Sequence, residues 1–299
     1  MIVIIRHHTE YRTRQMRKKI TRGIIIVLIN IIVIIAALEA LLRYIDPLGA
    51  YANYASAFVI QNRSYGTEDG FAIEAGKMNL PGFWTVTMLE DNTRLVPNSS
   101  ESDCKIAFVG DSFTFGWGVS DDETWVNQLA EDLPQASFYN TGKNAYNITN
   151  VRQTIENYPA DGYIYLIFDN DAELNEPFTF SDNGYLTGIT SYIFFATFYK
   201  GEDIGQQAYS SDPNAPMMVN YFSELETLTA RDDVLIFGLT NHPLIRDSIE
   251  RSPSVIPLNY QYENYVNSYA DNHSTPEGNK IIAERMLPYV APFVDKICN

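Results

Sequence analysis

The sequence predicts an α/β domain in which helices cover both faces of a parallel sheet, preceded by an N-terminal membrane helix. From residue 104 onward, short apolar runs alternate with segments whose apolar residues recur at helical spacing. The run GYIYLIF at 162–168 is apolar throughout, as expected for a strand covered on both faces. The apolar run at 23–42 is close to the ~20 residues needed to span a bilayer.

The elements of this domain are expected in a regular order. Strands are predicted at 105–110, 136–140, 162–168, 233–240 and 254–258. A capping box at Ser120–Glu123 precedes a first helix, and Ile148, Val151 and Ile155 mark a face of the second. Thr275 and Pro276 are predicted to start the last helix, and Pro288 to kink or end it.

Two segments stand apart from this alternation. Residues 44–103 are expected to form a linker and a small β-rich brace with a hairpin turn at 90–93. The α/β domain is predicted over 104–299, with an insertion at about 175–230 because the third and fourth strands lie farther apart than one helix requires. A lid, a substrate-facing wall and extra core packing are all open for this insertion.

Charge is distributed unevenly along the chain. Eight of the 21 Lys and Arg residues but only two of the 37 Asp and Glu residues lie in 1–43. The remainder therefore holds 13 basic and 35 acidic side chains, a net charge of −22. Such a domain repels nucleic acid, so no DNA or RNA partner is expected.

The basic residues support a membrane topology. Residues 1–22 are predicted to be cytoplasmic, 23–43 to form a single transmembrane helix, and the α/β domain to be extracytoplasmic. A cleaved signal peptide is the alternative, but no clear A-x-A site directly follows the apolar core, which favours an uncleaved anchor.

Cys104 and Cys298 are the two cysteines of the chain. Both are expected near the same edge of the sheet, the one at which the first strand begins. An oxidising compartment would permit a disulfide between them. The last helix, however, would span about 34 Å, longer than the strand beside it. A disulfide and two free thiols therefore both remain open.

Polar clusters follow the predicted strands. Gly110-Asp111-Ser112 comes after the first strand, NTGKNAYN (140–147) after the second, and DND (169–171) after the third, while Asp271-Asn272-His273 precedes the last helix. The carboxyl ends of parallel strands share one edge, so these groups are expected to converge. Together they offer the nucleophile, base, carboxylate and oxyanion donors that acyl transfer requires.

These clusters resemble the motifs of SGNH (GDSL-type) hydrolases over about residues 104–290. Gly110-Asp111-Ser112 is similar to the first family block, which implies Ser112 as the nucleophile and Asp111 as a supporting residue. Asn170-Asp171 is similar to the end of the third block, which implies that the Asn170 side chain donates to the oxyanion hole and that Asp171 supports it.

The resemblance extends to the base and the fold. Asp271 and His273 are similar to the fifth block, which implies His273 as general base and Asp271 as its orienting carboxylate. The implied fold is a flavodoxin-like three-layer α/β/α sandwich. No cofactor is implied.

Three positions depart from the family pattern. The second-block glycine corresponds to Ala145, with Gly142 nearby at a different offset, and the N–H of either could join that of Ser112 in the oxyanion hole. Phe168 stands where the third block usually opens with Gly, which is expected to narrow the site. Asp271 precedes His273 by two residues instead of the commoner three.

His242 is the other histidine beyond the membrane helix and an alternative base, but no carboxylate neighbours it in the sequence. A loop role is favoured. No pair of His at metal spacing and no C-x-x-C occurs in this part of the chain, so no metal is expected.

The predicted activity is an extracytoplasmic serine esterase acting on a small acyl ester, carried by a glycan or a lipid, through a Ser-His-Asp acyl-enzyme. Two alternatives stay open. An O-acyltransferase would use the same residues, and a cell-surface glycan-binding module would not use them catalytically. The oligomeric state is left open.

Overall fold

The computed structural model describes residues 2–45, 56, 59–60, 63–67, 70–80, 84–172, 212–240, 242–258 and 273–299. The chain forms two compact units, of which the first contains residues 1–47. The other described residues belong to the second unit.

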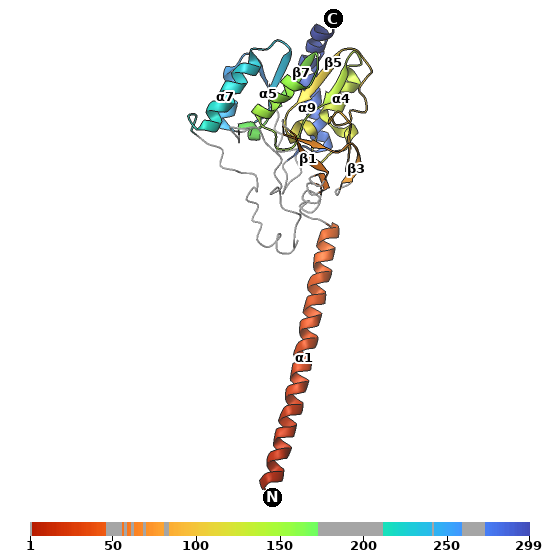
Figure 1. Cartoon of the computed structure of the whole chain (residues 1–299), viewed down its shortest axis with the longest axis vertical. Helices are drawn as coiled ribbons and strands as arrows, with labels where there is room; N and C mark the ends of the chain where they lie inside the picture. Colours follow the sequence, from red (N-terminus) through yellow and green to blue (C-terminus); the bar gives the residue numbers. More distant parts are fainter. Residues whose placement is uncertain are drawn as a thin grey trace. The chain divides into compact units, whose positions relative to one another are not determined.

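The described part of the first unit is one continuous helix, α1 (Ile2–Ile45) (Figure 1). Its segment Arg17–Leu42 has 26 residues, within which an 18-residue window reaches a mean hydropathy of 3.0, and it is the one helix in the described part of the chain that is long and apolar enough to cross a membrane. A signal sequence would pass the same test. The amide of Asn30 donates to the carbonyl of Ile26 at 2.9 Å, which satisfies this polar group within the helix.

The second unit is built on a five-stranded sheet in the order β6-β5-β7-β8-β9, with every pair parallel. Its strands are β5 (Lys105–Val109), β6 (Ser137–Asn140), β7 (Gly162–Ile167), β8 (Val234–Gly238) and β9 (Val255–Pro257). Counted along the chain this is the order 2-1-3-4-5 of flavodoxin-like sheets. The predicted parallel sheet is confirmed.

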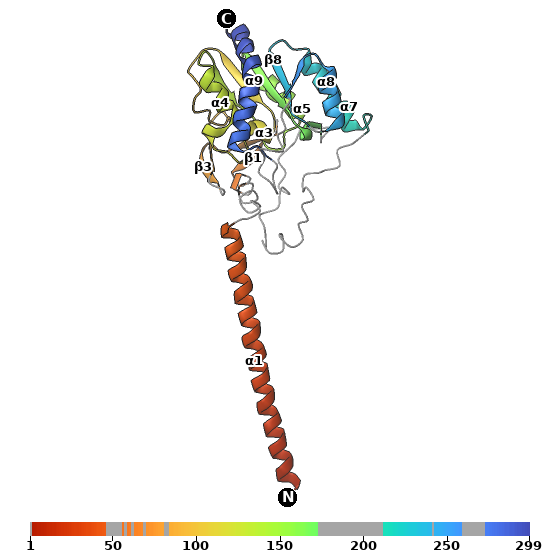
Figure 2. The same cartoon turned by 180° about the vertical axis from the view of Figure 1, so that it is seen from behind.

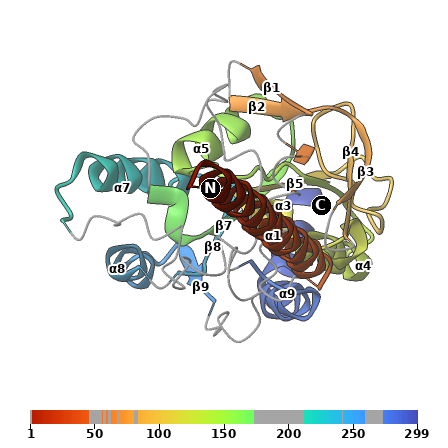
Figure 3. The ribbon, with the colours of Figure 1, turned by 90° about the horizontal axis from the view of Figure 1, so that it is seen from below.

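Helices cover both faces of this sheet (Figures 2 and 3). α4 (Trp125–Asp132) and α9 (Pro276–Cys298) pack on one face, while α5 (Ile148–Asn157), α7 (Pro216–Thr229) and α8 (Pro243–Arg251) pack on the other. The strands serve both cores because their side chains alternate: Ile106 and Phe108 point to the first core, Ala107 and Val109 to the second.

Two helix boundaries differ from expectation. α9 begins at Pro276 with Thr275 as its N-cap, as predicted, but it continues through Pro288 and Pro292 to Cys298, so Pro288 does not end it. Buried side chains on both sides of the prolines, such as Met286 and Val294, hold the helix against the sheet. The capping box at Ser120–Glu123 starts the 3-10 turn η1 (Asp121–Glu123), and α4 has its own N-cap, Thr124.

The brace, defined here as the described residues of 56–96, contains two antiparallel pairs. β1 (Ser64–Thr67) pairs with β2 (Gly70–Ile73), and β3 (Gly76–Leu80) with β4 (Trp84–Met88). The hairpin expected at 90–93 is present as a turn closed by an antiparallel bridge between Met88 and Arg94, with the N–H of Leu89 donating to the carbonyl of Thr93 at 2.8 Å. Arg94 also bridges Asn140 at the end of β6. The brace is thereby attached to the edge of the main sheet.

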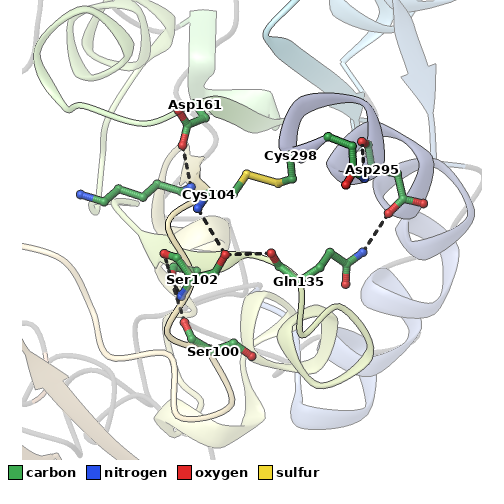
Figure 4. Close-up of a disulfide and its surroundings, with 10 residues drawn as sticks. Ser100, Ser102, Cys104, Gln135, Asp161, Asp295 and Cys298 are labelled. Atoms are coloured by element: carbon green, nitrogen blue, oxygen red, sulfur yellow. Dashed lines mark hydrogen bonds between the residues drawn. A yellow bond between two sulfur atoms is a disulfide. The ribbon is translucent and has the colours of Figure 1, made fainter.

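A disulfide joins Cys104 to Cys298 (Figure 4). Their Cα atoms are 5.5 Å apart. Cys104 lies just before β5 and Cys298 is the last residue of α9, so the bond fixes the far end of the helix to the start of the strand. Gln135 adds a hydrogen bond to Asp295 of the same helix at 3.1 Å.

We expect the double variant Cys104→Ser/Cys298→Ser to lose about 2–5 kcal/mol of unfolding free energy, because the bond closes a separation of 194 residues in the unfolded chain. Urea denaturation of the variant and of the native protein, each with and without reductant, measures the loss. Reductant should change the native protein only. A loss below about 0.5 kcal/mol would contradict a structural role for the bond.

Candidate active site

The candidate site lies at the carboxyl edge of the sheet, where the strand order reverses between β5 and its neighbours. Ser112 follows β5, the loop 140–147 follows β6, and the 3-10 turn η2 (Asp169–Ala172) follows β7. Ligands of open α/β sheets bind at such a switch point. The predicted convergence of these three loops therefore agrees with the observed topology.

Ser112 begins the four-residue helix α3 (Ser112–Phe115) on a sharp turn. Gly110 has φ +151°, and a Cβ there would lie 2.3 Å from Thr114 Oγ1, so the position requires glycine. The buried Asp111 caps α3, since its Oδ1 accepts the N–H of Phe113 at 2.9 Å. This turn presents Ser112 half-buried at the first helical position.

Ser112 and His273 are brought together by the fold. Ser112 Oγ lies 2.7 Å from His273 Nε2 across 161 residues of sequence. The imidazole is flanked by the rings of Phe113, at 5.1 Å between centroids, and Trp117, at 6.2 Å. A ring protonated at Nδ1 can accept the serine proton at Nε2 in this geometry. Asp271, the predicted orienting carboxylate, lies outside the described residues, and its role stays a prediction.

Gly142 and Ala145, both in the loop after β6, differ in their backbone conformation and hydrogen bonding. The N–H of Gly142 donates to Asn140 Oδ1 at 3.1 Å, and a Cβ at Gly142 would lie 2.4 Å from the backbone nitrogen of Phe115. Gly142 therefore allows this loop to approach α3. Ala145 has φ +59°, a left-handed conformation that costs a non-glycine residue about 1 kcal/mol.

Three N–H groups remain as candidate oxyanion donors. Within the part of the chain that the structure describes, nothing accepts the N–H of Ser112, the N–H of Ala145 or the side-chain amide of Asn170. The N–H of Gly142 is already bonded, so this geometry favours Ala145 over Gly142 as the second-block donor.

The turn that carries Asn170 is anchored by the residues on both sides. Asp171 Oδ2 accepts the N–H of Phe168 at 2.5 Å, and Asp169 Oδ1 accepts from Thr240 Oγ1 and from the N–H of His242. Burial, with a contribution from Asp171, raises the pKa of Tyr165 well above its ordinary value. Asp171 is itself fully buried, in agreement with a supporting role.

Phe168, the residue expected to narrow the site, stacks on a residue beside the nucleophile candidate. Its ring stacks on Phe113 with the centroids 3.7 Å apart, next to Ser112 in the chain. A glycine at this position would leave the face of Phe113 open. Phe168 is therefore joined to the ring of His273 through Phe113, which contacts both.

His242 has a structural role in this protein. Its Nδ1 accepts the N–H of Ile245 at 3.3 Å as the N-cap of α8. Although no carboxylate neighbours it in the sequence, the fold brings Asp169 to its backbone N–H, across 73 residues. Burial lowers the pKa of His242.

Lys143 is a functional candidate that sequence reasoning missed. It is 3% exposed, and its ammonium donates to the carbonyl of Asn92 in the brace. Its backbone N–H donates to the carbonyl of Gly110 at 3.1 Å. Burial lowers the pKa of Lys143 to about 7, with Asp91 opposing the shift. Its only sequence signal is its position beside Gly142.

Metal ligation has no support in this region. Among the residues with described positions, no group of three or more His, Cys, Asp or Glu side chains could hold a metal ion.

We expect Gly142→Ala to lower the rate of any reaction at Ser112, because the new Cβ would collide with backbone of α3 that cannot move without shifting the serine. Gly66→Ala is the matched control, since a Cβ there meets nothing within 4 Å. Thermal unfolding and the rate of Ser112 labelling by a fluorophosphonate measure the two effects. Identical labelling rates in both variants would contradict this packing role.

We expect Lys143 to make stability depend on pH. Between about pH 7 and 10.5 the unfolded chain keeps a proton that folded Lys143 has released, so the unfolding free energy rises by up to about 1.4 kcal/mol per pH unit. Below pH 7 both states hold this proton and the contribution is constant. Urea denaturation from pH 6 to 9.5 should show this rise for the native protein relative to Lys143→Met. Parallel curves would contradict it.

No model of a known family matches the chain, and no curated protein sequence matches it. Solved structures with a similar fold include a lipolytic protein of the G-D-S-L family from Desulfitobacterium hafniense DCB-2, at 14% identity and a TM-score of 0.36 over 62% of this chain and 99% of that one. An acetyl xylan esterase from Butyrivibrio proteoclasticus matches at 11% identity and a TM-score of 0.37, over 65% of each chain. A psychrotrophic esterase from Pseudoalteromonas sp. matches at 11% and 0.38, over 64% of this chain and all of that one. Scores this low do not carry activity or substrate from these proteins to this chain.

Proposed function

We propose that this protein is a membrane-anchored, extracytoplasmic serine ester hydrolase of SGNH type. The observation that carries the proposal is the 2.7 Å contact between Ser112 Oγ and His273 Nε2 at the carboxyl edge of a parallel sheet. A hydroxyl hydrogen-bonded to an imidazole is the arrangement that activates a serine nucleophile.

The reaction proceeds in two steps. Ser112 Oγ attacks the ester carbonyl while His273 Nε2 takes the serine proton, and His273 returns it to the alcohol as the ester C–O bond breaks. Water then attacks the acyl-enzyme, with His273 as base, and releases the acid. In this proposal Asp271 holds the tautomer of His273 that is protonated at Nδ1.

The oxyanion is stabilised by the N–H of Ser112, the N–H of Ala145 and the side-chain amide of Asn170. Removing one such donor typically costs about 3 kcal/mol of barrier. The anchoring of Asp169 and Asp171 supports this role of Asn170, because a preorganised donor needs no rearrangement during the reaction.

The substrate we propose is a small acyl ester of a glycan or lipid. Phe113 and Trp117 pack beside the ring of His273, and Phe168 stacks on Phe113, an aromatic environment that favours a compact apolar acyl group. The anchor would hold the enzyme near esters at the outer face of the membrane.

Two independent observations support the proposed location. The basic residues ahead of the apolar part of α1 favour a cytoplasmic N-terminus. The disulfide between Cys104 and Cys298 belongs to an oxidising compartment, where the second unit would then lie.

We expect the full-length protein in detergent micelles to hydrolyse p-nitrophenyl acetate and butyrate. Ser112→Ala and His273→Asn should each reduce kcat/KM by at least about 1,000-fold. His242→Asn, which retains an N-cap for α8, and Ser223→Ala, on the exposed surface of α7, should keep native turnover.

The outcomes separate the alternatives. Turnover that is indifferent to Ser112 would contradict the proposal. Acyl transfer to added sugars in place of hydrolysis, lost in Ser112→Ala, would identify an O-acyltransferase. Glycan binding without turnover, unchanged in Ser112→Ala, would identify a binding module.

A further inference from the structure

Arg94 is a fully buried arginine that the proposed mechanism does not use. It comes from the brace, outside the sheet that carries the candidate site, and is 1% exposed. Burial lowers the pKa of its guanidinium, and Asp121 opposes this. A buried charge with this much desolvation is retained only where its hydrogen-bonding groups are satisfied.

All five N–H groups of this guanidinium are used. Its acceptors are Asp121 Oδ1 at 2.9 Å, the carbonyls of Phe115 and Gly116 at 2.7 Å, the carbonyl of Val119 at 2.6 Å and the carbonyl of Thr85 at 3.2 Å. Four of the five belong to the segment 115–121, which follows Ser112 directly in the chain.

These contacts bear on Ser112 through α3. The last carbonyls of a helix lack partners within it, and Arg94 supplies donors to those that end α3. The N–H groups of Gly116 and Trp117 both return to the carbonyl of Ser112, at 2.9 and 3.0 Å. Gly116 has φ +84°, and a Cβ there would lie 2.9 Å from Arg94 Nη1, so this glycine admits the guanidinium.

The same segment also contacts His273. Trp117 follows Gly116, and its ring packs between His273 and Trp84 of β4, which lies 5.3 Å away. A shift of the 115–117 backbone would therefore move both the N–H groups that hold the carbonyl of Ser112 and the Trp117 ring that packs beside His273.

Arg94 reaches the loop after β6 as well. Its backbone N–H donates to the carbonyl of Asn140 at 2.8 Å. The side chain of Asn140 in turn donates to the carbonyl of Thr114 at 2.8 Å and accepts the N–H of Gly142. One residue of the brace thus connects the turn of Ser112 to the loop of Ala145.

We propose that Arg94 is a positioning residue that sets the geometry of Ser112 relative to His273 and Ala145, so that the catalytic unit includes the brace. The inference rests on the proposed function of Ser112. It assigns to the brace a role in the rate of the reaction and not in stability alone.

The test compares Arg94→Lys and the double variant Arg94→Met/Asp121→Asn in the full-length protein. The double variant removes both members of the buried ion pair, so no uncompensated charge prevents folding, and the amide introduced by Asp121→Asn keeps an acceptor oxygen for the N–H of Thr87. Arg152→Ala is the matched control, because Arg152 is also ion-paired, with the carboxylates of Glu156 and Glu224, but on the helices α5 and α7.

We expect the double variant to fold and to lose about 100-fold in kcat with KM little changed, because the serine is displaced while the acyl pocket remains. Arg94→Lys should recover part of this loss. Hydrogen exchange of the amides at 115–117 should accelerate by about tenfold or more, since charge-assisted hydrogen bonds that hold the turn are gone.

The two readouts separate the two claims. Native kcat and native exchange at 115–117 in a folded double variant would overturn the positioning role. If fluorophosphonate fails to label Ser112 in the native protein, the proposed function fails, and the exchange measurement still decides whether Arg94 holds the turn. A matching loss of kcat in Arg152→Ala would show a general effect of removing a buried or paired arginine and would also overturn the inference.

Discussion

The packing of α9 against β5 is the constraint on which the candidate site depends. Ser112 directly follows β5 and His273 lies three residues before α9, so they meet only when the helix is aligned with the strand. The alignment is fixed at the far end of α9 by the disulfide between Cys104 and Cys298, and the first turn of α9 is held by the N–H of Trp125, the first residue of α4, which donates to Asn279 Oδ1 at 3.0 Å. A rotation or slip of α9 would separate the nucleophile from its base.

The brace adds a second level of control. Its apolar side chains share a core with Phe115, Trp117 and Tyr146, which belong to the loops after β5 and β6. Arg94 and Lys143 supply the polar links across this contact, because each buried side chain donates to backbone carbonyl groups: Arg94 to those of Phe115 and Gly116, and Lys143 to that of Asn92. The brace is thus tied by apolar and polar contacts to the two loops that carry Ser112 and Ala145.

Much of the fold could be predicted from the sequence because its signals are local. Apolar runs predicted the five strands of the main sheet, and Thr275-Pro276 predicted the start of α9. The contacts that could not be predicted join distant residues: the disulfide, the approach of Asp169 to His242, and the five bonds of Arg94. The preference for Ala145 over Gly142 as a candidate oxyanion donor rests on one hydrogen bond, in which Asn140 Oδ1 accepts the N–H of Gly142. The spacing of residues in the sequence does not predict this bond.

We propose above that Ser112 is a nucleophile activated by His273. The reactivity of Ser112 is measured most directly by covalent labelling of the full-length protein with a fluorophosphonate, followed by mass spectrometry of the labelled peptide. We expect one adduct, on Ser112, formed rapidly in the native protein and at least about 1,000-fold more slowly in His273→Asn. Labelling at another serine, or labelling of Ser112 at an equal rate in both proteins, would contradict it.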